Sequence, residues 1–298
     1  MSAIVAATSP DITFADGAPG FSLPDAILYY ADNPVEWVKD ILGVVPDEWQ
    51  GRALDALVAH HHVAIRSGSG VGKSALMSWA TLWFLSTRPH PKIPSTAPTQ
   101  HQLYDVLWSA HSEWINRSEY LQQTLEWTRT RVTMRGHEAT WFAVARTARS
   151  RAGQEVADAL QGFHSEHLMY AVDEAPGVPE AVFVALKGAL TGFNVYTLMA
   201  GNPSRVEGTF YDAFHRLSDI YTTFHVNSED TPRVSRTYVD LMRRDCGPDW
   251  RNSMVYWIKV LGEFPRSATG SDLLIPIQLI DNLTVPKDPC ELLGTSER

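Results

Sequence analysis

The residue types that bind phosphate occur together in one run, Arg66-Ser67-Gly68-Ser69-Gly70-Val71-Gly72-Lys73-Ser74. Glycines let the backbone curl so that successive N–H groups face phosphate oxygens, and a lysine at the end of the curl neutralises their charge. A hydroxyl in the next position reaches a magnesium ion bound to the same phosphates. Gly70, Gly72, Lys73 and Ser74 supply these parts, so the run predicts a phosphate-binding loop.

The segments on either side of the loop have the patterns of a strand and a helix. Residues 62–65, His-Val-Ala-Ile, are typical of a buried strand, and residues 75–80 begin a helical pattern whose N-terminus would face the phosphates. The strict loop pattern, G-x-x-x-x-G-K-[ST], has a glycine where this chain has Ser67. Gly68 and Gly70 still permit the turn, and the alternative is an ordinary Gly-Ser connection between a strand and a helix.

Two carboxylates follow the next strongly apolar run, Leu168-Met169-Tyr170-Ala171-Val172. Such a run predicts a strand buried on both faces, whose end brings Asp173 and Glu174 to the same rim of a parallel sheet as the loop. There the first acid would hold magnesium and the second would polarise an attacking water. An apolar run before Asp-Glu is also an ordinary strand-end turn, but its place after a phosphate loop favours the chemical interpretation.

Two further polar residues are candidates on weaker grounds. Residues 195–200 predict a third core strand, and Asn202 in the following Gly-Asn-Pro would sense the γ-phosphate from its tip; the alternative is a turn chosen only for its geometry. Upstream of the loop, Gln50 beside Trp49 would contact adenine, because an amide both donates to and accepts from a base edge. The alternative is an ordinary exposed helix residue, with Trp49 in the core.

Composition indicates a globular α/β protein. The 298 residues contain enough apolar side chains for a core, Cys246 and Cys290 lack metal-ligand spacing, and neither a membrane-spanning run nor a signal sequence is present. We expect a loose arm at residues 1–22, one domain at 23–265 and a linker at 266–298. Within the domain we expect two short helices between 23 and 42, a helix from Asp47, a strand at 93–97, a helix at 101–114, a hairpin at 131–145, a strand at 221–226 with His225 in the core, and helices at 237–243 and 253–260.

The formal net charge is −9, so the surface as a whole repels nucleic acid. DNA binding would therefore use a local basic surface or another subunit. The densest basic segment, Arg146-Thr-Ala-Arg149-Ser-Arg151, is such a surface, although a solvated face explains it equally simply.

Taken together, the loop, Asp173-Glu174 and Gly-Asn-Pro resemble the ATPase domain of the large terminase subunit of tailed bacteriophages. The resemblance covers residues 32–264. It also rests on Trp49-Gln50, on Thr96-Ala97-Pro98-Thr99 with Gln102, and on Leu160-Gln161-Gly162-Phe163-His164. No one of these is diagnostic, but their order and spacing together are specific.

The resemblance implies a P-loop NTPase of the additional-strand type (ASCE), with a mostly parallel central sheet flanked by helices. It implies an ATPase that uses ATP and Mg²⁺ to translocate double-stranded viral DNA into a procapsid, acting as a homo-oligomeric ring with a portal and a small terminase subunit in the cytoplasm of an infected bacterium. By motif, nucleotide binding is assigned to Gln50, Gly68, Gly70, Val71, Gly72, Lys73 and Ser74, magnesium to Ser74 and Asp173, water activation to Glu174, and coupling to Asn202.

The family also supplies an arginine to the nucleotide, in some members from the neighbouring subunit. Candidates here are Arg66 and the three arginines of the basic segment, of which we favour Arg149 in trans, with Arg66 as the alternative. Family members usually carry a second, nuclease domain, but no acidic array follows position 270, and nuclease activity is not expected of this chain. Two other functions remain open, a helicase or repair ATPase and an assembly module that ATP switches without turnover.

Overall fold

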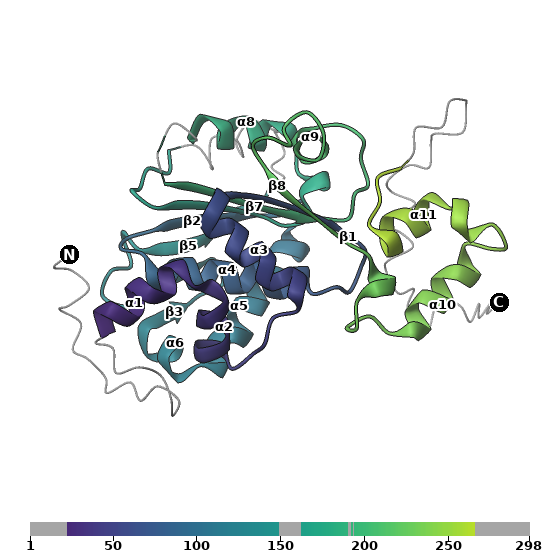
Figure 1. Cartoon of the computed structure of the whole chain (residues 1–298). Helices are drawn as coiled ribbons and strands as arrows, with labels where there is room; N and C mark the ends of the chain where they lie inside the picture. The colour runs from purple at the N-terminus through teal and green to yellow at the C-terminus, as the bar shows by residue number, and fades with distance from the viewer. Residues whose placement is uncertain (1–22, 149–161, 190–191, 193, 266–298) are drawn as a thin grey trace, which may run out of the picture.

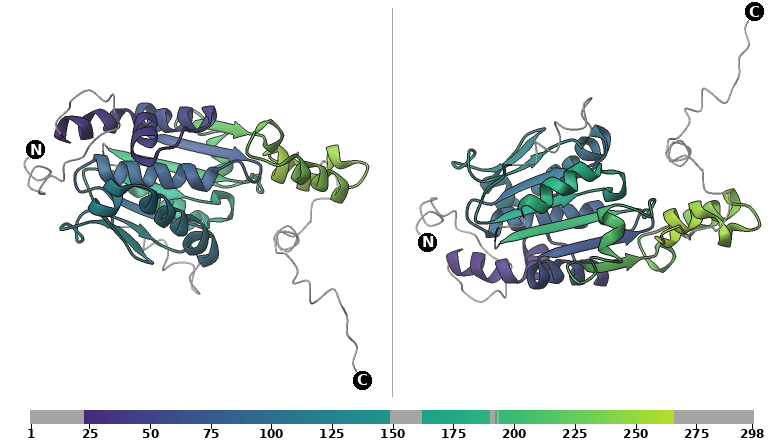
Figure 2. Two further views of the ribbon diagram at one scale, coloured as in Figure 1. Left: turned by 90° about the horizontal axis from the view of Figure 1, so that it is seen from below. Right: turned by 90° about the horizontal axis from the view of Figure 1, so that it is seen from above.

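The computed structural model describes residues 23–148, 162–189, 192 and 194–265, which build one eight-stranded sheet with helices on both faces (Figures 1 and 2). In the order in which they lie across the sheet, the strands are β3 (Leu125–Trp127), β4 (Arg131–Met134), β5 (Phe142–Ala145), β2 (Lys92–Thr96), β6 (Leu168–Val172), β7 (Val195–Gly201), β1 (His62–Ser67) and β8 (Thr222–Val226). From β5 to β8 all neighbours are parallel, whereas β3, β4 and β5 pair antiparallel. Because β7 lies between β1 and β6, the strand order is that of the additional-strand class, as predicted.

Two apolar layers hold the sheet between its helices. The larger layer packs under α1 (Leu23–Asp32), α2 (Pro34–Leu42), α3 (Glu48–His60), α4 (Lys73–Thr87), the π-helical η1 (His101–Trp108), α5 (Ser109–Arg117) and α6 (Glu119–Thr124). The smaller layer packs under α8 (Glu180–Ala189) and α9 (Thr209–Ala213) on the opposite face (Figure 1). Alternation along β1 serves both layers, because Val63 and Ile65 enter the larger one and Ala64 the smaller one.

The central helix α4 is buried along nearly its whole length. Trp79, Trp83 and Phe84 are fully buried, and Trp83 Nε1 donates to the carbonyl of Tyr30 in α1 at 2.7 Å. A helix that is apolar on all sides requires cover on all sides, which here comes from the sheet, α1, α2 and α5. This packing fixes the N-terminus of α4, where the predicted phosphate loop ends.

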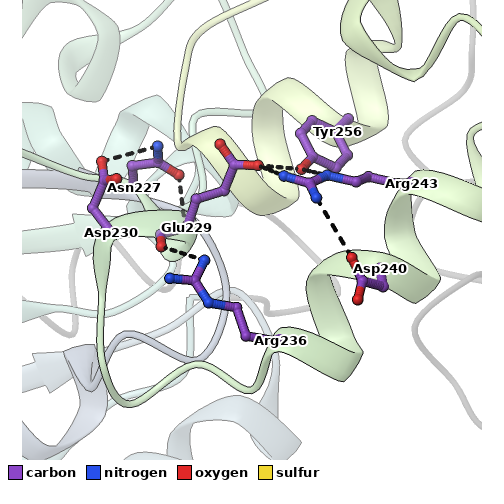
Figure 3. A network of polar contacts seen from close by, with 7 residues as sticks. All are labelled: Asn227, Glu229, Asp230, Arg236, Asp240, Arg243 and Tyr256. Carbon is purple, nitrogen blue, oxygen red and sulfur yellow. Dashed lines mark hydrogen bonds and ion pairs between the residues drawn. The ribbon is translucent and has the colours of Figure 1, made fainter.

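Residues 227–265 form a helical segment beyond the ends of β1 and β8 (Figure 1). It contains η3 (Ser228–Asp230), α10 (Arg236–Asp245), η4 (Trp250–Asn252), α11 (Met254–Tyr256) and the π-helical η5 (Trp257–Leu261). Its own small core consists of Val239, Tyr256 and Val260. Glu229 ties it together by accepting from Tyr256 Oη at 2.6 Å and from Arg243 (Figure 3).

Most of the expected elements are confirmed. The break at Asn33-Pro34 separates α1 from α2, and Gly43 ends α2 in the left-handed conformation. The helix expected at 253–260 is α11 continued by η5, and α6, α8 and α9 were not predicted. His225 is exposed rather than in the core, because β8 is the edge strand, and its Nε2 bonds the carbonyl of Leu261. The expected arm at 1–22 and linker at 266–298 lie outside the described residues. No described helix is long and apolar enough to span a membrane.

Candidate nucleotide-binding site

The predicted phosphate loop connects β1 to α4, the arrangement that nucleotide phosphates require. Gly70 and Gly72 adopt φ of 78° and 97°, in the left-handed region that glycine enters without strain. In the described part of the chain, no backbone oxygen accepts from the N–H groups of residues 70–72. The first N–H groups of α4 also have no partner within the helix. The loop therefore presents a row of donors in which an anion would fit.

Lys73 lies inside this loop. Its Nζ donates to Ser67 Oγ at 2.9 Å and to the Gly68 carbonyl at 3.0 Å. Burial lowers the pKa of the Lys73 ammonium, and the charges of Glu174 and Asp173 oppose that shift. Ser67 keeps a negative φ, since the described non-glycine residues with positive φ are His61, His90 and Glu174. A serine is therefore tolerated where the strict pattern has glycine, and here it serves as an acceptor for the lysine.

The two predicted carboxylates lie at the tip of β6. Asp173 is buried, and its Oδ1 accepts from the Glu174 N–H at 3.0 Å. Burial and the charge of Glu174 raise the Asp173 pKa to about 7, against the effect of Lys73. Glu174 itself has a φ of 44°, which a residue with a Cβ rarely adopts and which fixed surroundings must maintain.

Asn202 connects three strands at this rim. Its Nδ2 donates to the Ser67 carbonyl at 2.7 Å, and its backbone N–H donates to Glu174 Oε2 at 3.4 Å. No described residue donates to its Oδ1. The preceding Gly201 permits this approach, because a Cβ there would lie 2.4 Å from Pro176 Cδ. The end of the loop strand, the acidic strand and the third strand thus meet around one side chain.

Gln50 also contacts the loop, although not as an exposed helix residue. It is fully buried, accepts from the Asp47 N–H at 2.9 Å and donates to the Gly72 carbonyl at 3.1 Å. The exposed-residue alternative is therefore wrong, because Gln50 completes the N-terminal cap of α3 and supports the loop at once. Contact with adenine stays a prediction.

The arginine candidates are separated by the fold. Arg66 Nη1 donates to the Gly262 carbonyl at 3.0 Å and pairs with Glu263, and its guanidinium lies 5.6 Å from the Phe264 ring centroid. Use of Arg66 at the phosphates would require breaking these contacts. Arg146 follows β5, four strands from β1, which is roughly 19 Å at about 4.8 Å per strand. Arg149 and Arg151 lie outside the described residues.

One neighbour of the loop was missed by sequence reasoning. Arg233 pairs with Asp47 through Nε and lies against Gly72. The partners are 186 positions apart, so no local pattern in the sequence could have identified the contact.

The site has the oxygen ligands that suit magnesium. Ser74 offers a hydroxyl at the start of α4, and Asp173 offers a buried carboxylate whose raised pKa a bound cation would lower. Mg²⁺ commonly uses one or two such ligands together with substrate phosphates. Accordingly, the described residues contain no cluster of three or more His, Cys, Asp or Glu side chains arranged for a metal.

Comparisons with known proteins agree on one family, although no protein-family model matches the chain. The chain is 31% identical over 218 residues to the "Probable terminase, large subunit" of Enterobacteria phage P7, covering 70% of this chain and 43% of that protein. It thus spans less than half the length of that curated relative.

Solved structures share the fold at low sequence identity. The large terminase ATPase domain of Thermus phage P74-26 matches with a TM-score of 0.58 and 19% identity, over 78% of this chain and 99% of its own. The HK97 large terminase matches with a TM-score of 0.58 and 12% identity, over 82% and 56%. The large terminase of a thermophilic bacteriophage, in complex with ADP, matches at 0.55 and 12%, over 73% and 53%. With this fold and a relative at 31% identity, the chain belongs to the family of bacteriophage large terminase subunits.

Proposed function

We propose that this chain hydrolyses ATP at the β1–α4 loop and uses the energy to translocate double-stranded DNA into a procapsid. The observation that carries the proposal is the position of Asn202, which bonds the Ser67 carbonyl and receives Glu174 at its backbone N–H. Through it, the phosphate loop is connected to the candidate water-activating carboxylate. A site that only bound nucleotide would not need this connection.

Each residue has a distinct chemical part in the proposed reaction. Lys73 and the N–H groups of residues 70–74 would hold the phosphates and offset their negative charge. Glu174 would accept a proton from the attacking water, and its left-handed backbone directs it from the tip of β6. Ser74 and Asp173 would hold Mg²⁺, which neutralises charge developing on the phosphate oxygens when it is bound.

The position of the basic segment supports an arginine acting in trans. β5 leads into it at the same rim as β1, but roughly 19 Å to one side at about 4.8 Å per strand. That separation is too great for an arginine side chain to reach its own loop, whereas a neighbouring subunit would bring the segment alongside. We therefore keep Arg149 as the proposed trans arginine, in a ring that assembles with the portal and small terminase subunit in the host cytoplasm.

Relatives support the choice of nucleotide. A similar fold in the large terminase of a thermophilic bacteriophage is described in complex with ADP. ATP is the corresponding substrate for this chain. The net charge of −9 favours a ring that grips DNA through a local channel over a subunit that binds DNA alone.

ATP turnover with magnesium tests the proposal, with the protein concentrated or supplied with DNA so that a ring can form. Wild type should hydrolyse ATP, and Glu174→Gln should bind ATP with little turnover. Absence of turnover despite tight binding, with Glu174→Gln indistinguishable from wild type, would instead identify a nucleotide-switched assembly module. Unwinding of a duplex without a procapsid would identify a helicase.

A further inference from the structure

The loop between η3 and α10 lies directly along the predicted phosphate loop. Val234 Cγ2 is 3.5 Å from the position that a Cβ on Gly70 would take, and Arg233 Cδ is 3.5 Å from the same position on Gly72. A turn fixes this approach, because the Val234 N–H donates to the Thr231 carbonyl at 3.1 Å. The helical segment therefore places an arginine beside the row of free N–H groups.

Arg233 uses only part of its hydrogen-bonding capacity. Its Nε donates to Asp47, and neither Nη1 nor Nη2 has an acceptor among the described residues. Arg243 in the same segment is the contrast, since its Nε, Nη1 and Nη2 donate to Tyr256, Asp240 and Glu229 (Figure 3). Arg243 is a structural cross-link. Arg233, whose side chain is 39% exposed, is oriented by one carboxylate and keeps a planar pair of donors for a ligand.

The sheet order shows which end of a nucleotide Arg233 would meet. Glu174 and Asn202 lie at the tips of β6 and β7, so the reacting phosphate belongs on that side of β1. Arg233 follows β8, on the other side of β1, next to Asp47 and Gln50. A nucleotide bound to the loop would therefore extend its α-phosphate and nucleoside towards Arg233, away from the site of hydrolysis.

We propose that Arg233 is a nucleotide-binding residue that holds the α-phosphate of ATP and ADP alike through Nη1 and Nη2, while Asp47 retains Nε. This rests on the proposed function only in requiring that a nucleotide bind the loop. The α-phosphate is unchanged by hydrolysis, so the contact adds affinity without distinguishing substrate from product. It also ties the helical segment to the bound nucleotide.

The test is the dissociation constant of the full chain for Mg·ADP and Mg·ATP, measured by calorimetric titration. Arg233→Ala should raise both constants by about tenfold or more, the usual effect of losing a charge-assisted hydrogen bond, and by the same factor for each. The matched control is Arg236→Ala, which removes an equal charge three residues away, where Arg236 bonds only the Glu229 carbonyl. It should leave both constants within about twofold of wild type, since screened long-range charge contributes little. Arg233→Lys should recover part of the affinity.

Distinct results would overturn the inference. Equal, small changes in both alanine variants would mean that only the general field matters. Weaker ATP binding with unchanged ADP binding would place Arg233 at the reacting phosphate. Wild type that binds no nucleotide would overturn the proposed function together with this inference, whereas nucleotide binding unaffected by Arg233→Ala and Arg233→Lys would overturn the inference alone. A thermal unfolding curve for each variant checks that the fold is intact.

Discussion

Removal of the Asn202 side chain gives the most direct test of how the site is assembled. Asn202 is 7% exposed, and its Nδ2 supplies the 2.7 Å hydrogen bond to the carbonyl of Ser67. Asn202→Ala leaves that buried carbonyl without this donor. The same change disconnects the end of the phosphate-loop strand from the backbone that receives Glu174.

The magnitude follows from the burial of this bond. A buried polar group deprived of its partner costs about 1–3 kcal/mol of unfolding free energy. For a domain of this size, each kcal/mol lowers the melting temperature by about 2–4 °C, so we expect a fall of about 2–12 °C. Catalysis should suffer more than binding, because a shift of a catalytic group by about 1 Å costs up to about a hundredfold in rate. We expect kcat to fall between about tenfold and a hundredfold, with the ADP dissociation constant changed less than about threefold.

Three measurements on one preparation separate these effects: thermal unfolding, steady-state ATP hydrolysis and ADP titration. Asn252→Ala is the matched control, because Asn252 Nδ2 bonds Asp249 in an exposed turn remote from the loop. The control should leave kcat unchanged. If Asn202→Ala also kept the wild-type kcat, the assignment of Asn202 as the link between loop and carboxylate would be refuted.

Three further changes are predicted. Gly201→Ala should lower kcat at least about tenfold with ADP binding retained, because its Cβ would meet Pro176 Cδ at 2.4 Å and displace the turn that carries Glu174; a normal kcat would show that the turn adapts. Arg66→Ala should cost about 1–3 kcal/mol in urea unfolding through its lost contacts to the Gly262 carbonyl and Glu263, whereas a loss confined to kcat would identify it as the catalytic arginine. Burial lowers the His111 pKa to about 3, so the unfolded chain takes up a proton below about pH 6.5 that the folded chain refuses. Stability should therefore fall between about pH 6.5 and about pH 4 by up to about 1.4 kcal/mol per pH unit, and His111→Gln should flatten that slope in urea titrations.

The tips of the strands were predictable because each combines two local signals. The runs before Asp173 and Asn202 are apolar at nearly every position, as strands buried on both faces require, and both strands are fully buried. Parallel strands bring their carboxyl ends to one rim, so the polar residues after them meet. Local pattern together with this rule was enough to predict which elements form the site.

Contacts between distant segments were not predictable in this way. Gln50 is fully buried against Gly72, Arg66 is held by Gly262 and Glu263, which lie 196 and 197 positions later, and Arg233 pairs with Asp47. Each depends on how separate segments dock on the loop, and no single stretch of sequence encodes that. Exposure of His225 has the same origin, because strand alternation does not show which strand lies at the sheet edge.

The phosphate loop divides into two parts with different partners. In the first part, the Gly68 N–H donates to the Val226 carbonyl at 3.0 Å, and the Ser69 N–H donates to the Lys259 carbonyl at 2.7 Å. A Cβ on Gly68 would lie 2.3 Å from the Val260 carbonyl oxygen, so glycine is needed there for close packing. Residues 70–74 keep their N–H groups for phosphate. Nucleotide that orders the second part must therefore act on a backbone already bonded to η5, which makes the helical segment the element best placed to sense it.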